Sequence, residues 1–485
     1  MGKNATTHHP EKPFLDRMRA HKIPEEAIQA FTLHLNRLLC GESGFLTRKH
    51  IVPIDDLPTA DDIEGYRAAG EKMLPHTAII KLNGGLGTSM GLSRAKSLIP
   101  VKNGLTFLDL IARQTLALRE RYHTPVPLIL MDSFRTDRDT IMALRHYRSL
   151  ELEDLPLTFV QHRVPKILES SITPAVHRED PDLEWCPPGH GDLYTSLVTS
   201  GILKRLLERG ITYVFVSNAD NLGASLDPRL LGYMSETGTD FLVEVARRSP
   251  ADRKGGHLCR LKDGRIALRE AAQTPPAERD EFQDTRLYRY FNTNNIWIHL
   301  PTLEELLERY GNILPLATIV NRKNLDPRDP SSPAVIQLET AMGAAVTLFP
   351  KAAALNVPRS RFSPVKTTND LLAVRSDAYH VTSDFRLVLS LPGGEPPRID
   401  LDRRFYARID RFEERFPYGP PSLKACSSLT VCGNVFFGRG TRAVGTVEVV
   451  AGDEPVRVPD GAYLKGRMTL GSPHEGRSGA ATASS

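Results

Sequence analysis

Short apolar runs alternate with amphipathic stretches through the middle of the 485-residue chain, and this alternation limits the possible folds more than any other feature. Five runs have the length of buried strands: 76–83, 126–131, 157–161, 213–216 and 241–245. Three stretches between them have helical spacing: 106–122, 136–150 and 193–209. Strands separated by helices predict an α/β domain with a largely parallel sheet, whose ligands bind beyond the carboxyl ends of the strands.

The first of these strands runs directly into a glycine-rich stretch, KLNGGLGTSMG at 81–91. Glycines let the backbone approach a ligand closely, so that successive N–H groups can surround a phosphate. Lys96 and Lys102 add positive charge downstream. Taken alone, the stretch also fits a structural turn without function.

Two familiar phosphate-binding motifs do not match this stretch. A Walker A loop needs G-x-x-x-x-G-K-[ST], which is absent from it, and a dinucleotide fingerprint needs G-x-G-x-x-G. Gly85, Gly87 and Gly91 instead have the spacing G-x-G-x-x-x-G. Asp109, the nearest acidic residue that follows, lies inside a predicted helix rather than at the end of a second strand. The pattern therefore favours neither a P-loop enzyme nor a dehydrogenase.

Charge and cysteine content exclude some classes of protein. The chain has 62 basic and 58 acidic residues, a net charge of +4, which is too small and scattered for a nucleic-acid surface. Its five cysteines are odd in number and contain no C-x-x-C pair, which indicates reduced thiols and a cytoplasmic setting. No apolar run approaches the ~18 residues that would cross a membrane.

Both ends of the chain differ from the middle. Residues 14–39 have helical spacing, and we expect 1–75 to be a helical segment packed on a catalytic domain at 76–385. Within that domain the pattern predicts a hairpin at 257–270, a strand at 290–300 and a helix at 335–349. A proline-rich break follows residue 385, and the tail 471–485 has the composition of a disordered segment.

A six-residue period appears between these last two segments. Apolar or small side chains recur in two series: Leu429, Val435, Thr441 and Val447, and Val431, Phe437, Ala443 and Val449. With turn glycines between the repeats, the period indicates a parallel β-helix at 386–470, and an ordinary meander is the alternative.

Four polar strings stand where the apolar pattern stops: PPGHGD at 187–192, SNADNLGA at 217–224, NTNN at 292–295 and RSRFSPVKTTN at 359–369. Each has a structural alternative, because His190 suits a turn, Asp220 suits a helix cap and the asparagines suit a strand end. Asp220 directly after a buried strand is also suited to holding Mg²⁺, which prefers oxygen ligands and substrate phosphates. Lys96 and Lys366 could then stabilise the charge that develops in phosphate chemistry.

Together these strings resemble one family. The matching segments are KLNGGLGTSMGLSRAKS, FLDL, PLILMDSF, PPGHGD, SNADNLGA, KGG at 254–256, NTNN, QLETAMGAA at 337–345 and VPRSRFSPVKTTNDLL. In this order, over about 75–470, they closely resemble the UTP–glucose-1-phosphate uridylyltransferases (UDP-glucose pyrophosphorylases) of the eukaryotic-like type.

The resemblance implies a fold and a reaction. The fold would be α/β, a nucleotidyltransferase domain with a mixed, mostly parallel Rossmann-like sheet, followed by a C-terminal left-handed parallel β-helix. The reaction would be reversible and Mg²⁺-dependent, with a sugar-phosphate oxygen attacking the α-phosphate of UTP in line to give UDP-glucose and pyrophosphate. The expected partners are the small molecules UTP and glucose 1-phosphate, with neither nucleic acid nor membrane, and the state of a possible homo-oligomer stays open.

Roles of individual residues follow from the same resemblance. Lys96 and Lys366 would be catalytic, with Lys96 holding the triphosphate, Lys366 contacting the phosphates of both substrates and Asp220 holding the metal. The nucleotide would be bound by Leu82, Asn83, Gly84, Gly85, Gln161 and Gly189. The sugar phosphate would be bound by His190, Asn218, Gly256, Glu270, Asn292, Thr293 and Asn294.

The chain departs from the family pattern in a few places. The usual QSRYPRI is QHRVPKI at 161–167, so His162 and Val164 change the surroundings of the expected uracil site. The segment 326–333 is richer in proline and charge than usual, and the ending differs beyond Arg467. Alternatives to the implied activity are a broad-specificity UDP-sugar pyrophosphorylase and a non-catalytic nucleotide-sugar sensor. The turn KLNGGLGT argues against the N-acetylhexosamine enzymes, whose turn is of the LAGGQGTR type.

Overall fold

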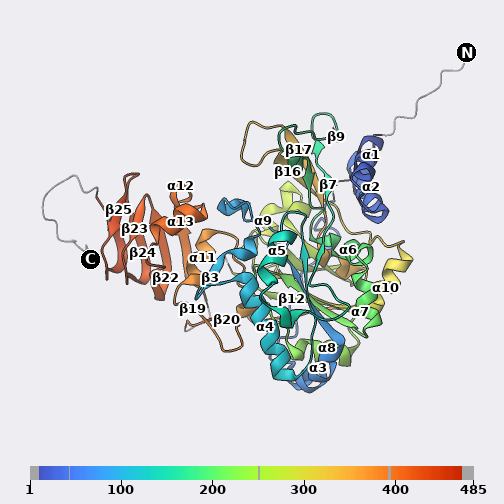
Figure 1. Ribbon diagram of the computed structural model, residues 1–485, viewed down its shortest axis with the longest axis horizontal. Helices are drawn as coiled ribbons and strands as arrows, with labels where there is room; N and C mark the ends of the chain where they lie inside the picture. Colours follow the sequence, from blue (N-terminus) through green and yellow to red (C-terminus); the bar gives the residue numbers. More distant parts are fainter. Residues whose placement is uncertain (1–9, 43, 250–251, 392–394, 472–485) are drawn as a thin grey trace, which may run out of the picture. The chain divides into compact units, whose positions relative to one another are not determined.

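The structure, a computed structural model, describes residues 10–42, 44–249, 252–391 and 395–471 (Figure 1). These residues form two compact units. The first unit lies within 1–85, 118–218 and 226–358, and the second within 86–117, 219–225 and 359–485. The units are interleaved in sequence, whereas the predicted segments 1–75, 76–385 and 386–470 are consecutive, and that division stays a prediction. The tail predicted to be disordered lies outside the described residues from 472 onward.

The first unit is built on a ten-stranded sheet with the order β1-β13-β15-β11-β2-β5-β6, in which β12 pairs with β15 and β18, and β14 with β13. The strands are β1 Ile51–Val52, β2 Thr77–Leu82, β5 Leu128–Asp132, β6 Thr158–Val160, β11 Tyr213–Asn218, β12 Phe241–Arg247, β13 His257–Leu261, β14 Ile266–Arg269, β15 Tyr290–His299 and β18 Ala352–Asn356. The predicted strands and the hairpin at Asp263-Gly264 are therefore confirmed.

The sheet is mixed, as predicted, but antiparallel pairing is more extensive than we expected. Strands β11, β2, β5 and β6 pair in parallel, whereas β15 runs antiparallel to β11, β12 and β13. The side chains of Ile296, Trp297 and Ile298 in β15 are all fully buried. A continuous apolar run of this kind marks a buried strand but carries no information about its direction, so the sequence pattern did not reveal the reversal.

Helices cover the sheet and bury its apolar side chains (Figure 1). Those of the first unit, besides two at the N-terminus, are α3 Arg67–Met73, α5 Asp137–Leu144, α6 Leu193–Thr199, α7 Ile202–Glu208, α8 Pro228–Thr237, α9 Arg279–Phe282 and α10 Leu300–Arg309, and α4 Phe107–Tyr122 crosses the boundary between the units. The helix predicted at 193–209 is divided, because Gly201 before α7 adopts a left-handed conformation at φ 73°. The helix predicted at 136–150 ends early, at Leu144.

Two helices at the N-terminus pack on a smaller sheet of the same unit. They are α1 Lys12–Ala20 and α2 Glu25–Leu39, separated at Pro24, and their apolar faces contact Trp185 and Leu338 among others. The smaller sheet has the order β16-β17-β8-β9. Its strands are β16 Ile319–Asn324, β17 Ala334–Glu339, β8 Ile167–Leu168 and β9 Thr173–Pro174, and the pair β7 Val164–Pro165 and β10 Trp185–Cys186 adjoins the same core.

The prediction of a helix at 335–349 is wrong. Residues 334–339 form strand β17, which pairs antiparallel with β16 and β8, and only 342–347 form a short 3-10 helix. Val335 and Ile336 are β-branched, which favours a strand, and both are buried. The segment forms a strand because it makes hydrogen bonds to strands distant in sequence. The apolar pattern of a short segment carries no information about such distant partners.

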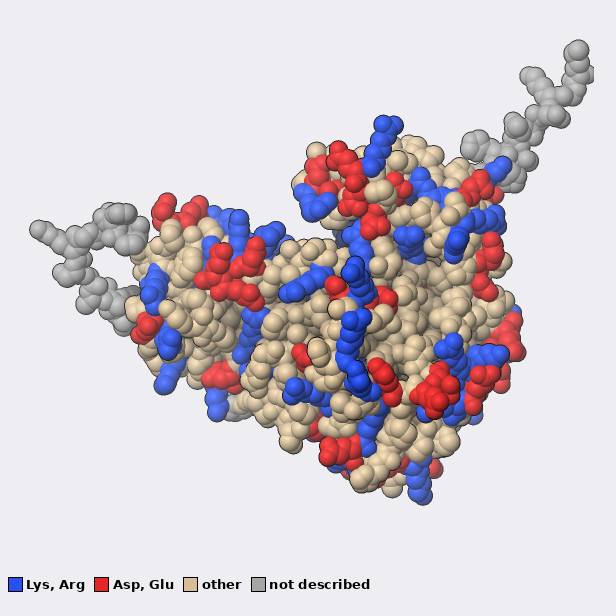
Figure 2. Space-filling view, viewed as in Figure 1, with Lys and Arg blue, Asp and Glu red and all other residues tan. Residues whose placement is uncertain are grey.

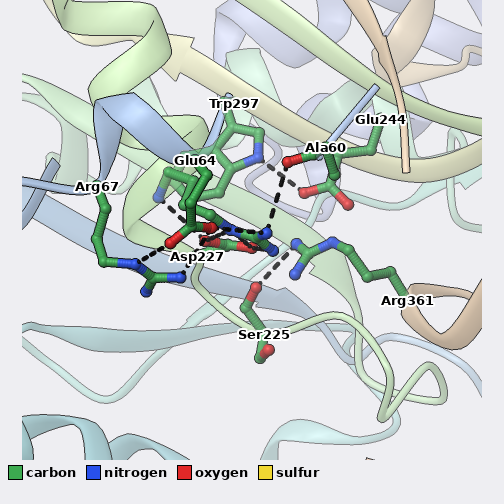
Figure 3. A network of polar contacts seen from close by, with 9 residues as sticks. Ala60, Glu64, Arg67, Ser225, Asp227, Glu244, Trp297 and Arg361 are labelled. Carbon is green, nitrogen blue, oxygen red and sulfur yellow. Dashed lines mark hydrogen bonds and ion pairs between the residues drawn. The ribbon is translucent and has the colours of Figure 1, made fainter. Parts of the chain in front are cut away.

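A polar network lies beside the sheet in the first unit (Figure 3). Arg229 at the start of α8 donates to both carboxylate oxygens of Asp227, with its shortest contact at 2.6 Å, and also to Glu64 at 3.3 Å. Within the sheet, the fully buried carboxylate of Glu244 accepts hydrogen bonds from Asn295 and from the indole of Trp297. The contacts of Glu244 satisfy a buried carboxylate, whereas Glu64 in the Arg229 group is largely exposed.

The second unit ends in strands that pair in parallel. The sheet β21-β22-β24-β26 and the pair β23-β25 are parallel throughout. The elements of this unit are β3 Pro100–Lys102, β4 Leu105–Thr106, α11 Thr368–Arg375, β19 Tyr379–Val381, β20 Leu387–Leu389, β21 Arg398–Leu401, α12 Arg403–Tyr406, α13 Ile409–Arg415, β22 Ser422–Cys432, β23 Val435–Phe437, β24 Arg442–Val450, β25 Val456–Val458 and β26 Tyr463–Thr469.

The six-residue period marks the core of this parallel region. Both series of side chains are at most 2% exposed. Leu429 lies opposite Val447 and Val431 opposite Val449, so each residue stacks on the one three repeats later. The parallel pairing excludes the antiparallel meander that the sequence had left open.

Basic and acidic side chains are interspersed on the face of the molecule shown in Figure 2. In the described part of the chain, no helix combines the length and apolar character that crossing a membrane requires.

Candidate active site

The ends of two central strands carry the first candidate residues. Strands β2 and β11 pair in parallel, with Leu82 opposite Asn218. One residue earlier, the buried Lys81 donates a hydrogen bond of 2.7 Å from Nζ to Ser217 Oγ. The register therefore brings the glycine turn that follows β2 to the same edge of the sheet as Asn218, as expected for ligand-binding strand ends.

Gly84 and Gln161 lie against each other at this edge. A Cβ atom on Gly84 would lie only 2.3 Å from Gln161 Nε2, so no larger residue fits without moving the glutamine side chain. Gln161 is 8% exposed and follows strand β6. By contrast, a Cβ on Gly85 would meet nothing within 4 Å. The structure thus places Gly84 and Gln161, which the family resemblance assigned to nucleotide binding, next to each other.

The side chain of Asn83 points into the protein rather than into the turn. It is 3% exposed, and its amide nitrogen donates to Asp132 Oδ1 at 2.6 Å and to Thr140 Oγ1 at 2.8 Å. Its backbone N–H donates to the carbonyl of Met131. Asn83 therefore anchors the turn through both its side-chain amide and its backbone N–H.

His162, the residue that departs from the family pattern, is fixed by Asp192. The carboxylate accepts the backbone N–H of His162 at 2.7 Å and contacts its Nδ1 at 2.9 Å. Thr199 Oγ1 lies 2.9 Å from the other ring nitrogen. The imidazole is thereby held within the protein, 8% exposed, directly beside Gln161.

The PPGHGD string packs against the segment that follows β17. A Cβ on Gly189 would lie 2.4 Å from the carbonyl oxygen of Thr340, and the Thr340 N–H donates to Pro188. His190 Nδ1 accepts the backbone N–H of Met342 at 3.0 Å. In a neutral imidazole this bond places the ring proton on Nε2, which can then donate to an anion.

The NTNN string forms an irregularity in strand β15. Glu244 lies opposite Asn295 and Val245 opposite Asn292, so residues 293–294 are extra on the β15 side. Asn294 adopts φ 63°, a left-handed conformation that asparagine tolerates, and its side chain donates to Asn218 Oδ1 at 3.3 Å. Thr293 is 1% exposed and donates to the Glu244 carbonyl, so its side chain is unavailable to a ligand in this conformation.

Gly256 and Glu270 meet at the open end of the β13–β14 hairpin. A Cβ on Gly256 would lie 2.3 to 2.6 Å from the Glu270 carboxylate oxygens, so a larger residue there would displace the Glu270 side chain. The Gly256 carbonyl also accepts the N–H of Asn292 at 3.0 Å. Burial raises the pKa of Glu270, and a hydrogen bond from Asn292 opposes the shift.

The second unit brings the three predicted charged residues together. Asp220 Oδ2 accepts hydrogen bonds from Lys96 Nζ at 2.6 Å and from Lys366 Nζ at 2.9 Å. Burial alone would raise the pKa of Asp220, but the Lys366 and Lys96 ammonium groups outweigh it and hold that pKa below its ordinary value. Burial lowers the pKa of Lys96, and Asp220 opposes this shift. We refer to Lys96, Asp220 and Lys366 as the lysine–aspartate cluster.

One carboxylate oxygen of this cluster lacks a hydrogen bond in the described part of the chain. Asp220 Oδ1 is buried and has no hydrogen-bond partner among the residues that the structure describes. A buried carboxylate oxygen left unpaired is costly, and hard cations such as Mg²⁺ prefer oxygen ligands of this kind. The donor set therefore fits a divalent metal held by one carboxylate together with substrate phosphates.

Lys366 sits immediately before a helix that is anchored at both ends. Asp370 Oδ2 accepts the backbone N–H of Lys366 and of Thr367, each at 2.8 Å, and Thr367 and Asp370 form a capping box at the start of α11. At the other end of α11, Lys102 Nζ donates to the carbonyls of residues 374–376. Lys102 is thus a helix cap, which corrects its sequence interpretation as a downstream phosphate-binding charge.

Sequence reasoning assigned no role to several residues that organise the site. Asp132 anchors Asn83, Thr340 and Met342 hold the PPGHGD string, and Asp370 caps α11. The Thr367-x-x-Asp370 capping pattern was visible in the sequence. The other contacts join segments far apart in the chain, and no local pattern signals them.

Comparison with known proteins identifies the family of this chain. The sequence profile of the family described as UTP–glucose-1-phosphate uridylyltransferase matches residues 30–443. A probable UTP–glucose-1-phosphate uridylyltransferase of Schizosaccharomyces pombe is 39% identical over 398 residues, 81% of this chain and 77% of the relative.

Solved structures agree with the sequence comparisons. A Trypanosoma brucei protein described as a UDP-glucose phosphorylase has 44% identity and a TM-score of 0.89, and the match covers 96% of this chain and 100% of the other. A mutant of the Leishmania major UDP-glucose pyrophosphorylase, solved in complex with UDP-glucose, has 43% identity and a TM-score of 0.87, with coverage of 96% and 100%. The chain belongs to the UTP–glucose-1-phosphate uridylyltransferase family.

Proposed function

We propose that this protein transfers uridylyl groups, making UDP-glucose and pyrophosphate from UTP and glucose 1-phosphate in a reversible reaction. A phosphate oxygen of the sugar attacks the α-phosphorus of UTP, a new P–O bond forms, and the bond to the leaving pyrophosphate breaks. The observation that carries the proposal is the lysine–aspartate cluster, in which two ammonium groups converge on one buried carboxylate. A protein that only bound a nucleotide sugar would not need this arrangement.

The residues at the strand ends of the first unit form the proposed binding surface. The backbone of residues 82–85 lines the nucleotide, and Gln161 and Gly189 lie beside the uracil. His190 offers its Nε2 proton to the sugar phosphate, while Asn218, Gly256 and residues 292–294 line the sugar side. Thr293 contributes by shaping the strand, because its hydroxyl is bound to Glu244. Glu270 accepts sugar hydroxyl hydrogen bonds, and such contacts discriminate strongly because a mismatched sugar leaves polar groups unpaired.

Asp220 is the proposed ligand of Mg²⁺, supported by its buried Oδ1, which has no hydrogen-bond partner in the described part of the chain. When bound, the cation offsets the charge of the nucleotide phosphates. Lys96 binds the triphosphate, and Lys366 stabilises charge on the transferred phosphate group. Positioning and preorganised charge supply most of the rate enhancement in reactions of this class.

Three further properties belong to the same proposal. The parallel strands of residues 398–469, whose stacked positions repeat every three six-residue units, support a left-handed parallel β-helix. The protein acts in the cytoplasm, as the cysteine content indicates. Its partners are the small-molecule substrates UTP and glucose 1-phosphate.

Pyrophosphate release by the purified protein tests the activity. The reaction contains Mg²⁺ and UTP with glucose, galactose or N-acetylglucosamine 1-phosphate, and TTP and ATP replace UTP as nucleotide controls. A strong preference for UTP with glucose 1-phosphate is the expected result. Comparable rates with all three sugars would instead identify a broad-specificity pyrophosphorylase. Binding of UTP by folded protein without pyrophosphate release would identify a sensor and contradict the proposal.

A further inference from the structure

Asp132 connects the ends of three neighbouring strands of the first unit. Its side-chain Oδ1 accepts a 2.6 Å hydrogen bond from Asn83, which follows β2. Its backbone carbonyl accepts the N–H of Gln161, which follows β6, at 2.8 Å. Asp132 itself is the last residue of β5, between those two strands. One residue therefore touches both the glycine turn and the glutamine that lies against Gly84.

The carboxyl group of Asp132 is costly for the fold. The residue is 0% exposed, and Oδ2 has no hydrogen-bond partner among the described residues. Burying a polar atom without a partner costs stability, so asparagine or an apolar residue would serve packing at least as well. Proteins accept such costs at functional sites.

We propose that Asp132 is a positioning residue for the uridine nucleotide, acting by holding Asn83 and Gln161 in place. A glycine turn has many accessible conformations, and restricting it before the ligand arrives reduces the entropy lost on binding. The restriction comes from the Asn83 side chain, which is tied to Asp132 and Thr140. This inference rests on the proposed function, since it assigns these strand ends to UTP.

Substitution by asparagine separates the hydrogen bond from the charge. An asparagine at 132 can present its Oδ1 to Asn83 and Thr140, as the aspartate does, without a negative charge. Leucine at 132 has a similar shape but accepts no hydrogen bond. If the hydrogen bond to Asn83 is what matters, Asp132→Asn should behave like the wild type and Asp132→Leu should not.

Asp240→Leu is the matched control. Asp240 directly precedes β12 of the same sheet, is partly buried and accepts a hydrogen bond of 3.2 Å from Thr302. Among the described contacts, none joins it to a residue assigned to the nucleotide. The leucine substitution there removes the same kind of contact without reaching the proposed site.

Equilibrium binding of UTP and of UDP-glucose to the purified variants is the decisive measurement. For Asp132→Leu we expect both dissociation constants to rise about tenfold, the effect of one lost hydrogen bond. We expect Asp132→Asn to stay within about threefold of the wild type and Asp240→Leu to be unchanged. The KM for glucose 1-phosphate and kcat at saturating UTP should be the same for all folded variants. A merely structural role would not confine the effect to the nucleotide.

Several outcomes would overturn the proposal. Wild-type UTP affinity in folded Asp132→Leu is one, and an Asp132→Asn variant as weak as Asp132→Leu is another. If Asp132→Leu does not fold, Thr140→Val removes the second hydrogen bond to Asn83 and must still weaken UTP binding severalfold. Failure of the proposed function is distinct, because the wild type itself would then neither bind UTP nor release pyrophosphate.

Discussion

The carboxyl group of Asp132 accepts a hydrogen bond of 2.6 Å from the side-chain amide of Asn83, the residue that joins strand β2 to the glycine turn. Burial raises the pKa of Asp132 to about 7, opposed by the hydrogen bonds from Asn83 and Thr140 and reinforced by the charge of Asp137. The group therefore changes its protonation state near neutral pH while it anchors the turn.

This raised pKa predicts a pH dependence of stability. The unfolded chain ionises Asp132 near its ordinary pKa of 3.8, whereas the folded protein retains the proton until about pH 7. The unfolded state thus binds fewer protons over this range, and the contribution of Asp132 to stability falls as the pH rises from about 4 to 7. Asp132→Asn removes this titration. The free energy of unfolding of the variant minus that of the wild type should therefore be larger at pH 8 than at pH 5 by roughly 1–3 kcal/mol. Urea denaturation of both proteins at the two pH values measures this difference, and a constant difference would contradict the expectation.

Gly84→Ala should weaken nucleotide binding without unfolding the protein. The new methyl group would overlap Gln161 Nε2, which is the end of a flexible side chain and can move. Displacing that amide from the expected uracil site should raise the KM for UTP and reduce the preference for UTP over CTP. Gly65→Ala is the control, because a Cβ there meets nothing within 4 Å.

A double mutant tests whether the effect of Gly84→Ala passes through the glutamine. If it does, adding Gly84→Ala to Gln161→Ala should have little further effect on the KM for UTP. Fully additive effects would show that Gly84 acts on the nucleotide independently of Gln161.

Lys366→Ala should lower kcat by roughly 10² to 10³, the scale associated with one preorganised transition-state contact. Lys366 is 57% exposed but is one of the two charges that balance the buried Asp220, so its loss should lower the melting temperature without unfolding the protein. Single-turnover kinetics with saturating substrates measure the chemical step directly. Lys465→Ala, at an exposed position of β26 in the same unit, is the matched control. Near-normal turnover in a folded Lys366→Ala protein would show that this lysine is not catalytic.

Asp220→Asn should raise the concentration of Mg²⁺ needed for half-maximal activity. The amide keeps the shape of the carboxylate but loses the charge that balances both lysines and would attract the cation. Binding of Mn²⁺ in the presence of UTP, followed by electron paramagnetic resonance, gives a readout that does not depend on turnover. Unchanged metal affinity in the variant would argue against Asp220 as a ligand.

Much of the fold could be predicted from local patterns. Apolar runs of strand length located β2, β5, β6, β11 and β12, and the Asp263-Gly264 turn located the hairpin, because these signals depend only on neighbouring residues. The six-residue period identified the buried positions of the parallel C-terminal strands for the same reason. The chemistry of polar residues at strand ends, and then the family resemblance, brought Lys96, Asp220 and Lys366 into one hypothesis, and their side chains do meet.

Pairing between distant segments was decided only by the tertiary structure. The reversed direction of β15, the strand at 334–339 and the use of Lys102 as a helix cap all depend on partners far away in sequence. The contact of Asp132 also depends on a distant partner, since a lone aspartate at a strand end does not reveal that it will meet Asn83, which follows the neighbouring strand β2. Residue periodicity determines which face of an element is buried, whereas hydrogen bonds across the fold determine the direction of each strand and the role of each buried polar group.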